Sequence, residues 1–142
     1  MHDIRLIRDA PGAFDEGLRR RGLAPMAAEA LALDERRRGL IHAAETALAE
    51  RNAASRDVGA AKARGDEAAF ERLRALVAEK KEEIARLEAE AAQADAVLRD
   101  LLMEAPNLPL EDVPVGADEA ANVELRRWGA PPVLDFAALE HF

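Results

Sequence analysis

The sequence predicts an all-α fold, a long antiparallel coiled-coil helical hairpin with a short N-terminal helix and a Pro-rich C-terminal connector. Two long stretches, residues 27–62 and 67–104, repeat apolar or small side chains in steps of three and four, which is the spacing of one helix face. Gly65 and Asp66 interrupt the pattern between them. Charged residues make up 34% of the 142 residues and aromatic residues only 4%, a composition typical of long helices.

Residues 1–26 form the first segment, in which apolar residues recur at near-heptad spacing. These apolar positions are Ile4, Ile7, Phe14 and Leu18. Pro11 suits the first turn of a helix, and Asp9, two residues earlier, is a candidate to cap it. Gly22 follows three arginines, and basic residues followed by glycine are a helix-stop signal. We therefore expect a short amphipathic helical unit here.

Residues 27–62 contain no proline and predict one long helix. The apolar or small positions of its expected contact face are Leu33, Leu40, Ala44, Leu48, Ser55 and Val58. Arg37 and Arg51 fill the two gaps in that face. Gly59, Gly65 and Asp66 then predict a break in the helix and a reversal of the chain.

Residues 67–104 predict a second helix with a more regular apolar face. Its contact positions are Phe70, Leu73, Val77, Lys80, Ile84, Leu87, Ala91, Ala94, Leu98 and Leu101. The two helices should pack antiparallel, because otherwise each would leave a long apolar face in water. With the turn centred near residue 64, Lys80 is expected beside Glu50, and Leu33 beside Val97. Parallel self-association of each helix is the competing arrangement.

Residues 105–142 differ in character from the hairpin. Five of the seven prolines of the chain lie here, at positions 106, 109, 114, 131 and 132. Residues 122–128 alternate in polarity and predict at most one strand, which cannot be stable alone. We therefore divide the chain into a helical unit (1–26), a coiled-coil arm (27–104) and a connector that begins a further, missing domain (105–142).

Charge is distributed unevenly along the predicted hairpin. Residues 51–81, which we name the distal segment, hold eight basic and five acidic residues. Residues 27–50 hold three basic and five acidic residues, and residues 82–104 hold two and seven. The hairpin is thus basic near its turn and acidic at its other end, although the whole chain has a net charge of −8.

This polarity suits an anionic partner that contacts the distal segment, where Lys and Arg would bind phosphates. The candidate residues are Arg56, Lys62, Arg64, Arg72 and Arg74. Arg51 and Lys80 are weaker candidates, because they occupy expected contact positions. Phe70 is the only aromatic residue of the distal segment, and the helix contact needs it, so recognition would rely on backbone and shape. The alternative is that the charge of a solvated coiled coil varies by chance.

The residue types give no catalytic, cofactor-binding or metal site. Cysteine is absent, which excludes a disulfide framework and cysteine-ligated metals. His2, His42 and His141 are scattered, and the segment around Lys62 lacks the Gly-Lys-Ser/Thr ending of a phosphate-binding loop. No apolar run is long enough to span a membrane. The first residues lack a signal-peptide pattern, so we expect a cytoplasmic protein.

Several motifs together give the chain a family resemblance. The stretches that carry it are residues 3–9 with Pro11 and Leu18, 20–22, 33–37, 50–52, 55–56, 106–109, 113–116 and 122–129. On these residues the chain resembles the N-terminal part of bacterial seryl-tRNA synthetase, a class II aminoacyl-tRNA synthetase. The last stretch, from Asn122 to Gly129, is the most specific in order and spacing. His2 departs from the pattern, and Ala replaces larger residues at several contact positions.

The resemblance implies a tRNA-binding arm that recognises the long variable arm and elbow of serine tRNA by shape and phosphate contacts. It implies a parent enzyme that ligates serine to tRNA with ATP and Mg²⁺ and that is a homodimer through its catalytic domain. The motifs for that chemistry are not in this chain, so we expect a fragment that holds no cofactor and is inactive alone.

Two alternatives explain the same heptads. A standalone coiled-coil scaffold that binds another protein accounts for them equally well, but not for the proline-rich connector. A truncated synthetase paralogue is the other alternative, and the basic distal segment does not separate it from the arm of a synthetase.

Overall fold

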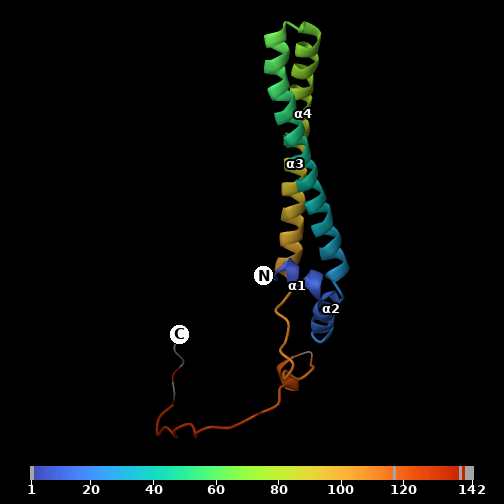
Figure 1. Ribbon diagram of the computed structural model, residues 1–142. Coiled ribbons are helices and arrows are strands. Elements are labelled where there is room, and N and C mark those ends of the chain that lie inside the picture. The colour runs from blue at the N-terminus through green and yellow to red at the C-terminus, as the bar shows by residue number, and fades with distance from the viewer. Residues whose placement is uncertain (1, 117, 138, 140–142) are drawn as a thin grey trace.

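The structure, a computed structural model, describes residues 2–116, 118–137 and 139. Its helices are α1 (Ile4–Asp9), α2 (Pro11–Arg19), α3 (Ala27–Arg64), α4 (Glu67–Glu104) and the 3₁₀ helix η1 (Glu119–Ala121). Figure 1 shows α3 and α4 as a long hairpin, with α1 and α2 beside the end that lies far from the turn. The described residues contain no strand, so the predicted all-α hairpin is confirmed.

The hairpin turn is made by two residues. Gly65 has φ 71°, a left-handed conformation that costs glycine little. Its N–H donates to the carbonyl of Lys62, and the N–H of Asp66 donates to that of Ala61, both at 3.1 Å, which closes α3 in a Schellman motif. The Asp66 side chain then accepts from the N–H of Ala69 and caps α4. The predicted break at Gly59 is wrong, because α3 runs through it.

The contact face of α4 is confirmed by the burial of Ile84, Leu87 and Leu98, although Leu102 is buried where Leu101 was expected. The contact face of α3 needs a larger correction. Leu48 is 38% exposed, and Ser55 is exposed as well. Ala47 and Ala54, one residue earlier in each case, are 2% and 5% exposed and take their places. In the observed contact face the steps between contact positions alternate strictly between three and four residues. The small alanine side chains there let the two helices approach closely.

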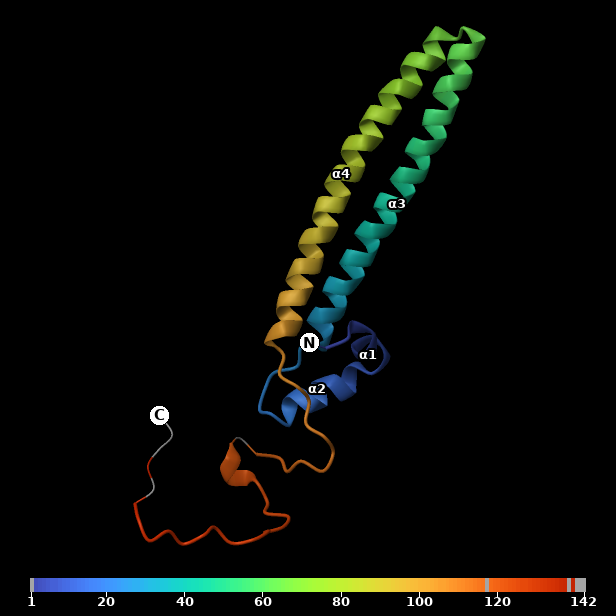
Figure 2. The same ribbon diagram turned by 90° about the vertical axis from the view of Figure 1, so that its left-hand side faces the viewer.

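The predicted antiparallel register is right to within about two residues. Lys80 Nζ lies 2.8 Å from Glu50 Oε2, as expected. Leu33 instead packs in the cluster that contains Leu98, and Val97 is 48% exposed. The turn therefore lies at residues 65 and 66 rather than at 64. Figure 2 shows the two helices side by side along their length in a second view.

The N-terminal unit consists of two short helices rather than one. Asp9 is the last residue of α1 and does not cap α2. The N-cap of α2 is Ala10, which makes no side-chain hydrogen bond, so the predicted cap by Asp9 is wrong. The predicted stop at Gly22 is confirmed by its φ of 73°. Asp15 has an unpredicted role, because its carboxylate accepts from the N–H groups of residues 26 and 27 and satisfies donors at the start of α3.

The N-terminal unit closes the open end of the hairpin. Its buried side chains form one cluster with residues of α3 and α4. The buried members of this cluster are Ile7, Phe14, Leu18, Ala27, Ala30, Leu98, Leu102 and Ala105. Nearby, the ring of His2 lies edge-on to Phe14, with centroids 5.1 Å apart. The N-terminal unit therefore packs on the end of the hairpin that lies opposite the turn.

The first part of the connector runs along α2. Arg20 donates to the carbonyls of Leu110 and Val113. Leu108 packs against Gly17 so closely that a Cβ added there would lie 2.8 Å from it. Residues 122–128 form no strand, and all seven are exposed. The single strand allowed by the sequence is therefore absent from the described residues.

Candidate nucleic-acid interface

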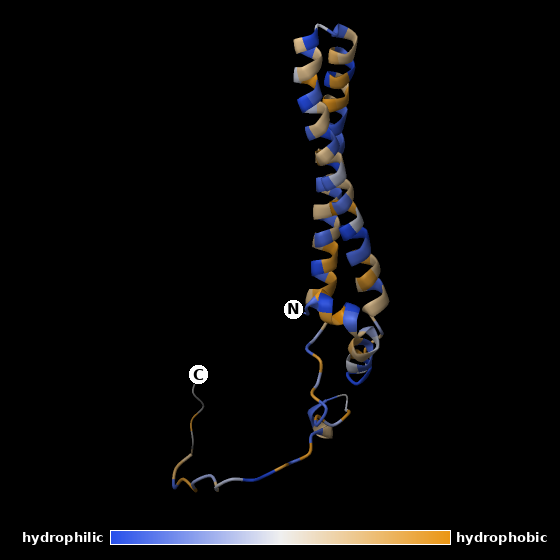
Figure 3. Cartoon of the chain, in the orientation of Figure 1, coloured by the Kyte–Doolittle hydropathy of each residue, from blue (hydrophilic) through white to orange (hydrophobic). Residues whose placement is uncertain are grey.

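The five cations predicted to bind RNA lie at the turn end of the hairpin. Arg56, Lys62 and Arg64 stand on the last turns of α3, and Arg72 and Arg74 on the first turns of α4. All five are exposed. The reversal at Gly65 brings the two groups together, although the chain separates them. Figure 3 shows hydrophilic residues interleaved with hydrophobic ones along both helices of this end.

Most of these cations have no ionic partner in the structure. Within the described residues, no ion pair involves Arg56, Lys62, Arg64 or Arg72. Arg74 is partly compensated, because its guanidinium lies 3.3 Å from a Glu71 oxygen. It also lies 5.4 Å from the centre of the Phe70 ring, where the cation faces the π-system. The interface therefore presents cations whose charge an anionic ligand can neutralise.

Lys80, a weaker candidate, belongs to the helix contact and not to the interface. Its side chain is only 19% exposed, and its Nζ lies 2.8 Å from Glu50 and 2.7 Å from Glu83. These hydrogen bonds, with Glu50 contributing most, raise the pKa of Lys80. Arg51 is half-buried and donates to the side chain of Asn52 at 2.9 Å.

Four of the five cations fall on two flanks of the hairpin, whereas Arg56, about 100° further around α3 than Ser55, points away from α4. A shallow groove of 270 Å³ between the helices is lined by Ser55, Val58, Arg74, Val77, Ala78 and Lys81. Lys62 comes seven residues after Ser55, about two helical turns, and so shares that flank. On α3, Arg64 lies two residues after Lys62, and on α4, Arg72 lies two residues before Arg74. Two residues correspond to about 200° around a helix, so Arg64 and Arg72 face the other flank.

Lys81 was counted among the basic residues of the distal segment but was not one of the five candidates. It is exposed, lines the groove with Arg74 and follows it by seven residues. That spacing places both cations on one side of α4 and was available in the sequence as a signal. The groove flank therefore offers Lys62, Arg74 and Lys81, with the small Ala78 between the two α4 cations leaving room for a ligand.

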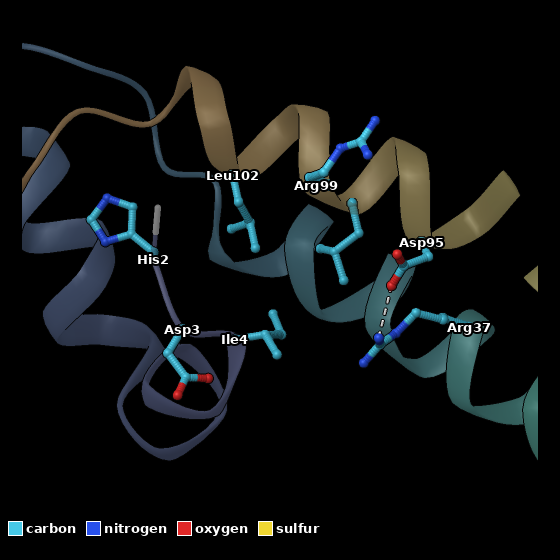
Figure 4. Close-up of a pocket in the computed structure, with 8 residues that line it drawn as sticks. His2, Asp3, Ile4, Arg37, Asp95, Arg99 and Leu102 are labelled. Atoms are coloured by element: carbon cyan, nitrogen blue, oxygen red, sulfur yellow. Dashed lines mark hydrogen bonds and ion pairs between the residues drawn. The ribbon is translucent and has the colours of Figure 1, made fainter. Parts of the chain in front are cut away.

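The other end of the hairpin has a larger pocket, in which Arg37 is paired with carboxylates. This pocket has a volume of 440 Å³ and lies between α1, α3 and α4. Figure 4 shows Arg37 and Asp95 pointing toward one another across it, with Nη1 and Oδ1 2.8 Å apart. The hydrogen bond to Asp95, followed by that to Asp34, raises the pKa of Arg37. Its charge is thus already neutralised by carboxylates.

The described residues offer no candidate metal centre. They contain no group of three or more His, Cys, Asp or Glu side chains placed to hold a metal ion. The Nε2 atom of His2 lies 2.9 Å from the carbonyl oxygen of Pro106, which indicates a structural role. His141 lies outside the described residues. No helix in the described ranges combines the length and apolarity needed to cross a membrane.

Comparison with known proteins gives one consistent family. The sequence profile described as "Seryl-tRNA synthetase N-terminal domain" matches residues 1–109. The chain is 67% identical over its full length to a serine–tRNA ligase of Ruegeria pomeroyi and 61% identical to one of Paracoccus denitrificans. In both cases the match covers 33% of the relative, so the chain spans about a third of the length of these relatives.

A solved structure has the same fold. A crystal structure of seryl-tRNA synthetase from Pyrococcus horikoshii, complexed with ATP, superposes with a TM-score of 0.82 at 31% sequence identity. The superposition covers 91% of this chain and 29% of that one.

Proposed function

The chain belongs to the seryl-tRNA synthetase N-terminal domain family, and from this premise we propose that it is the tRNA-binding arm of a serine–tRNA ligase. In this proposal the exposed cations of the distal segment contact phosphates of serine tRNA. The single observation that carries it is the concentration of exposed cations, most of them in no ion pair among the described residues, around the turn of a hairpin whose other end is acidic. Such a surface attracts a polyanion to one end and repels it from the other.

We propose recognition of the shape and backbone of an RNA stem. Phe70 is the only aromatic residue of the distal segment, and it is half-buried in the helix contact beneath Arg74. Base stacking, which needs an accessible aromatic face, is therefore not supported. Lysine and arginine can bind the phosphates and ribose hydroxyls of a helical stem, which supports the long variable arm and elbow of serine tRNA as the target.

We propose that the ligation of serine to tRNA is catalysed by the part of the ligase that this chain does not span. There, a catalytic domain would use ATP and Mg²⁺ to ligate serine to tRNA and would form a homodimer. Residues 1–26 would close the arm, residues 27–104 would form it, and residues 105–142 would connect it to that domain. The exposure of Leu125 and Trp128, 93% and 90%, supports the connector, because large apolar side chains seldom remain in water without a partner.

One observation favours a second candidate, a protein-interaction scaffold. Ile41 and Leu48 are 40% and 38% exposed and line a second shallow groove along the hairpin, near its middle. A partner helix could bury them. The groove has 230 Å³ and is bordered by Glu45 and Glu88, whose negative charge disfavours RNA at this place.

A charge-reversal experiment tests the proposed function. Arg64, Arg72 and Arg74 are replaced together by Glu in the 142-residue chain, and its affinity for serine tRNA is measured by filter binding at low salt. We expect at least about tenfold weaker binding, because three phosphate contacts are lost and repulsion is added. In the longer ligase, serine activation should be unchanged.

The matched control has the same change in net charge at positions of the hairpin outside the distal segment. It replaces Arg36, Arg86 and Arg99, which are exposed outside the distal segment, by Glu. This variant should keep nearly the affinity of the unmodified chain. Equal affinity of the distal variant and the unmodified chain would show that these residues do not bind the tRNA.

A further inference from the structure

Helix α2 contacts the hairpin on one side and the connector on the other. The carboxylate of Asp15 accepts hydrogen bonds from the N–H groups of Met26 and Ala27, both at 2.9 Å. Met26 is the N-cap of α3, and Ala27 is its first residue. Gly17 lies two residues after Asp15, about 200° around the helix, and so faces the opposite side of α2. The connector passes there, because Leu108 packs against Gly17.

Directional contacts hold the connector in its course over the N-terminal unit. Arg20, just after α2, donates from Nη1 to the carbonyl of Leu110 at 3.1 Å and from Nη2 to the carbonyl of Val113. The Nε2 atom of His2 lies 2.9 Å from the carbonyl oxygen of Pro106. One planar guanidinium thus reaches two carbonyls that lie three residues apart. These contacts fix the course of the connector and not only its distance from α2.

The absence of a side chain at Gly17 lets the connector lie against α2. A Cβ added at Gly17 would lie 2.8 Å from Cδ2 of Leu108 and 3.2 Å from its Cβ. Leu108 also packs against the apolar cluster of the N-terminal unit. A larger residue at position 17 would therefore push the connector outward. Glycine inside a helix costs stability relative to alanine, so the close contact gives this glycine a structural reason.

The relation between the hairpin and the connector matters because the hairpin is long. A helix of 38 residues extends about 57 Å at 1.5 Å per residue, so a rotation of about 10° at its base moves the turn by about 10 Å. A hydrogen bond between a cation and a phosphate oxygen tolerates only a few tenths of an ångström around its usual length. A small change at α2 would therefore become a large displacement of the distal cations relative to the connector.

We propose that α2 is a rigid junction that fixes the direction of the hairpin relative to the connector. Asp15 is the positioning residue on the hairpin side, and Gly17 and Arg20 are the positioning residues on the connector side. For its consequence in the charging of tRNA this inference rests on the proposed function. The relation of hairpin and connector is a property of the chain alone and can be measured with no RNA present.

The absence of cysteine from the chain makes the measurement simple. Cysteines introduced by Ala32→Cys on α3 and Val115→Cys in the connector, both at exposed positions, carry the only two spin labels. Pulsed electron–electron resonance then gives the distribution of the distance between them. The first variant is Gly17→Ala. Its matched control is Gly12→Ala, the same substitution in the same helix, where an added Cβ meets nothing within 4 Å.

We expect a narrow distance distribution in the labelled chain and in Gly12→Ala, and at least a doubling of its width in Gly17→Ala. Helical content, followed by circular dichroism, should be retained in both, because alanine is the better helix former. Arg20→Gln is the second variant. Its shorter side chain cannot reach both connector carbonyls, so the width should also double. An unchanged width in folded Gly17→Ala and Arg20→Gln would overturn the inference.

The hairpin side of the junction is tested by two substitutions of Asp15. Asp15→Ala removes the acceptor for the N–H groups at the start of α3 and should at least double the width of the distribution. Asp15→Asn keeps an acceptor oxygen in the same place and should leave the width unchanged. Equal widths in the two variants would contradict the positioning role of Asp15.

Measurements with tRNA separate the inference from the proposed function. Gly17→Ala should leave the affinity of the 142-residue chain for serine tRNA unchanged, because the distal cations stay in place on the hairpin. In the longer ligase, it should lower kcat/KM for aminoacylation at least about fivefold and leave serine activation unchanged, because a bound tRNA would be misplaced.

The two proposals fail in different experiments. A doubled width in Gly17→Ala, with tRNA affinity unaffected by charge reversal of the distal segment, would support the junction and contradict RNA binding there. Loss of tRNA binding in the charge-reversal variant, with an unchanged width in Gly17→Ala and Arg20→Gln, would contradict only the junction.

Discussion

At the scale of single residues, small side chains decide how the two helices meet. Ala47 and Ala54 are buried where Leu48 and Ser55 were expected. A reading that ranks residues by hydrophobicity favours leucine over its alanine neighbour. A close helix contact reverses this preference, because the smaller residue is the one that fits between two backbones. The strict three-and-four spacing was the better guide, and it points to Ala47.

The contact face of α3 can be tested by enlarging it. Replacing Ala47 by Leu inserts three carbons into a close contact and should lower the free energy of unfolding by about 1–3 kcal/mol. The control is Ala49→Leu on the exposed side of the same helix, which should change it by less than about 0.5 kcal/mol. Urea unfolding followed by circular dichroism gives both values. Equal effects would mean that Ala47 does not face α4.

Lys80 is the residue for which the sequence predicted both position and partner. It interrupts an apolar face, and its only acidic neighbour across the hairpin in the expected register is Glu50. Burial of its carbon stem and the two carboxylates at its end make the charge tolerable at this position. The second partner, Glu83, lies one turn further along α4 and follows from the ordinary i,i+3 spacing.

The pH dependence of stability should report this pair. Because the carboxylates raise the pKa of Lys80, its contribution is present below the ordinary value of 10.5 and is lost as the pH rises above it. Unfolding of the chain and of Lys80→Met is compared at pH 7, pH 9 and pH 11. The difference between their free energies of unfolding should be the same at pH 7 and pH 9. At pH 11 it should shift in favour of the variant, because the unmodified chain loses part of the contribution of Lys80. A steady change between pH 7 and pH 9 would contradict the assignment.

At the scale of elements, the structure separates two glycines that look alike in sequence. Gly65 ends α3 with a positive φ, whereas Gly59 continues the helix with nothing within 4 Å of an added Cβ. The sequence alone could not choose, because either glycine can stop a helix. The hydrogen bonds around the turn favour Gly65, because Asp66 can cap α4 only if the chain reverses at Gly65.

These two glycines give opposite predictions for the same substitution. Gly65→Ala forces a Cβ into the left-handed region and should lower the free energy of unfolding by about 1–2 kcal/mol. Gly59→Ala should raise it by about 0.5–1 kcal/mol, because alanine is the better helix former. Thermal unfolding measures both. If Gly59→Ala lowered the free energy of unfolding, the result would instead support the break in the helix that the sequence predicted at Gly59.

The ends of the hairpin were harder to predict than the hairpin itself. The caps by Asp15 and the ionic contacts of Asp34 join residues that lie far apart in the sequence or on separate helices. Heptad spacing contains no information about them. The connector is a similar case, since its contact with Gly17 depends on the path of residues 106–113 over α2 and not on any local pattern.

At the scale of the whole molecule, charge and length act together. The hairpin separates the cations of the distal segment from the acidic residues near its base, and both groups were visible in the sequence. Whether the cations of the two helices gather at one end of the hairpin depended on the reversal of the chain, which the structure confirms. Their division between two flanks was not predicted, because it depends on the rotation of each helix about its own axis.

The salt dependence of tRNA affinity should report the number of phosphates that the distal segment contacts. Each phosphate contact contributes a slope of about −0.7 to −0.9 to the plot of log affinity against log salt concentration. The variant with Arg64, Arg72 and Arg74 replaced by Glu should therefore show a slope shallower by about 2–3 than the unmodified chain. Equal slopes would place the phosphate contacts elsewhere.

The central claim is that the turn end of the hairpin binds tRNA and the base does not, and site-specific crosslinking tests it most directly. A photoreactive residue is placed at Ala63, beside the turn, or at Ala92, exposed on the acidic part of α4. Each chain is irradiated with serine tRNA. We expect a crosslinked product from position 63 and none from position 92. Crosslinking from position 92, with none from position 63, would contradict the claim.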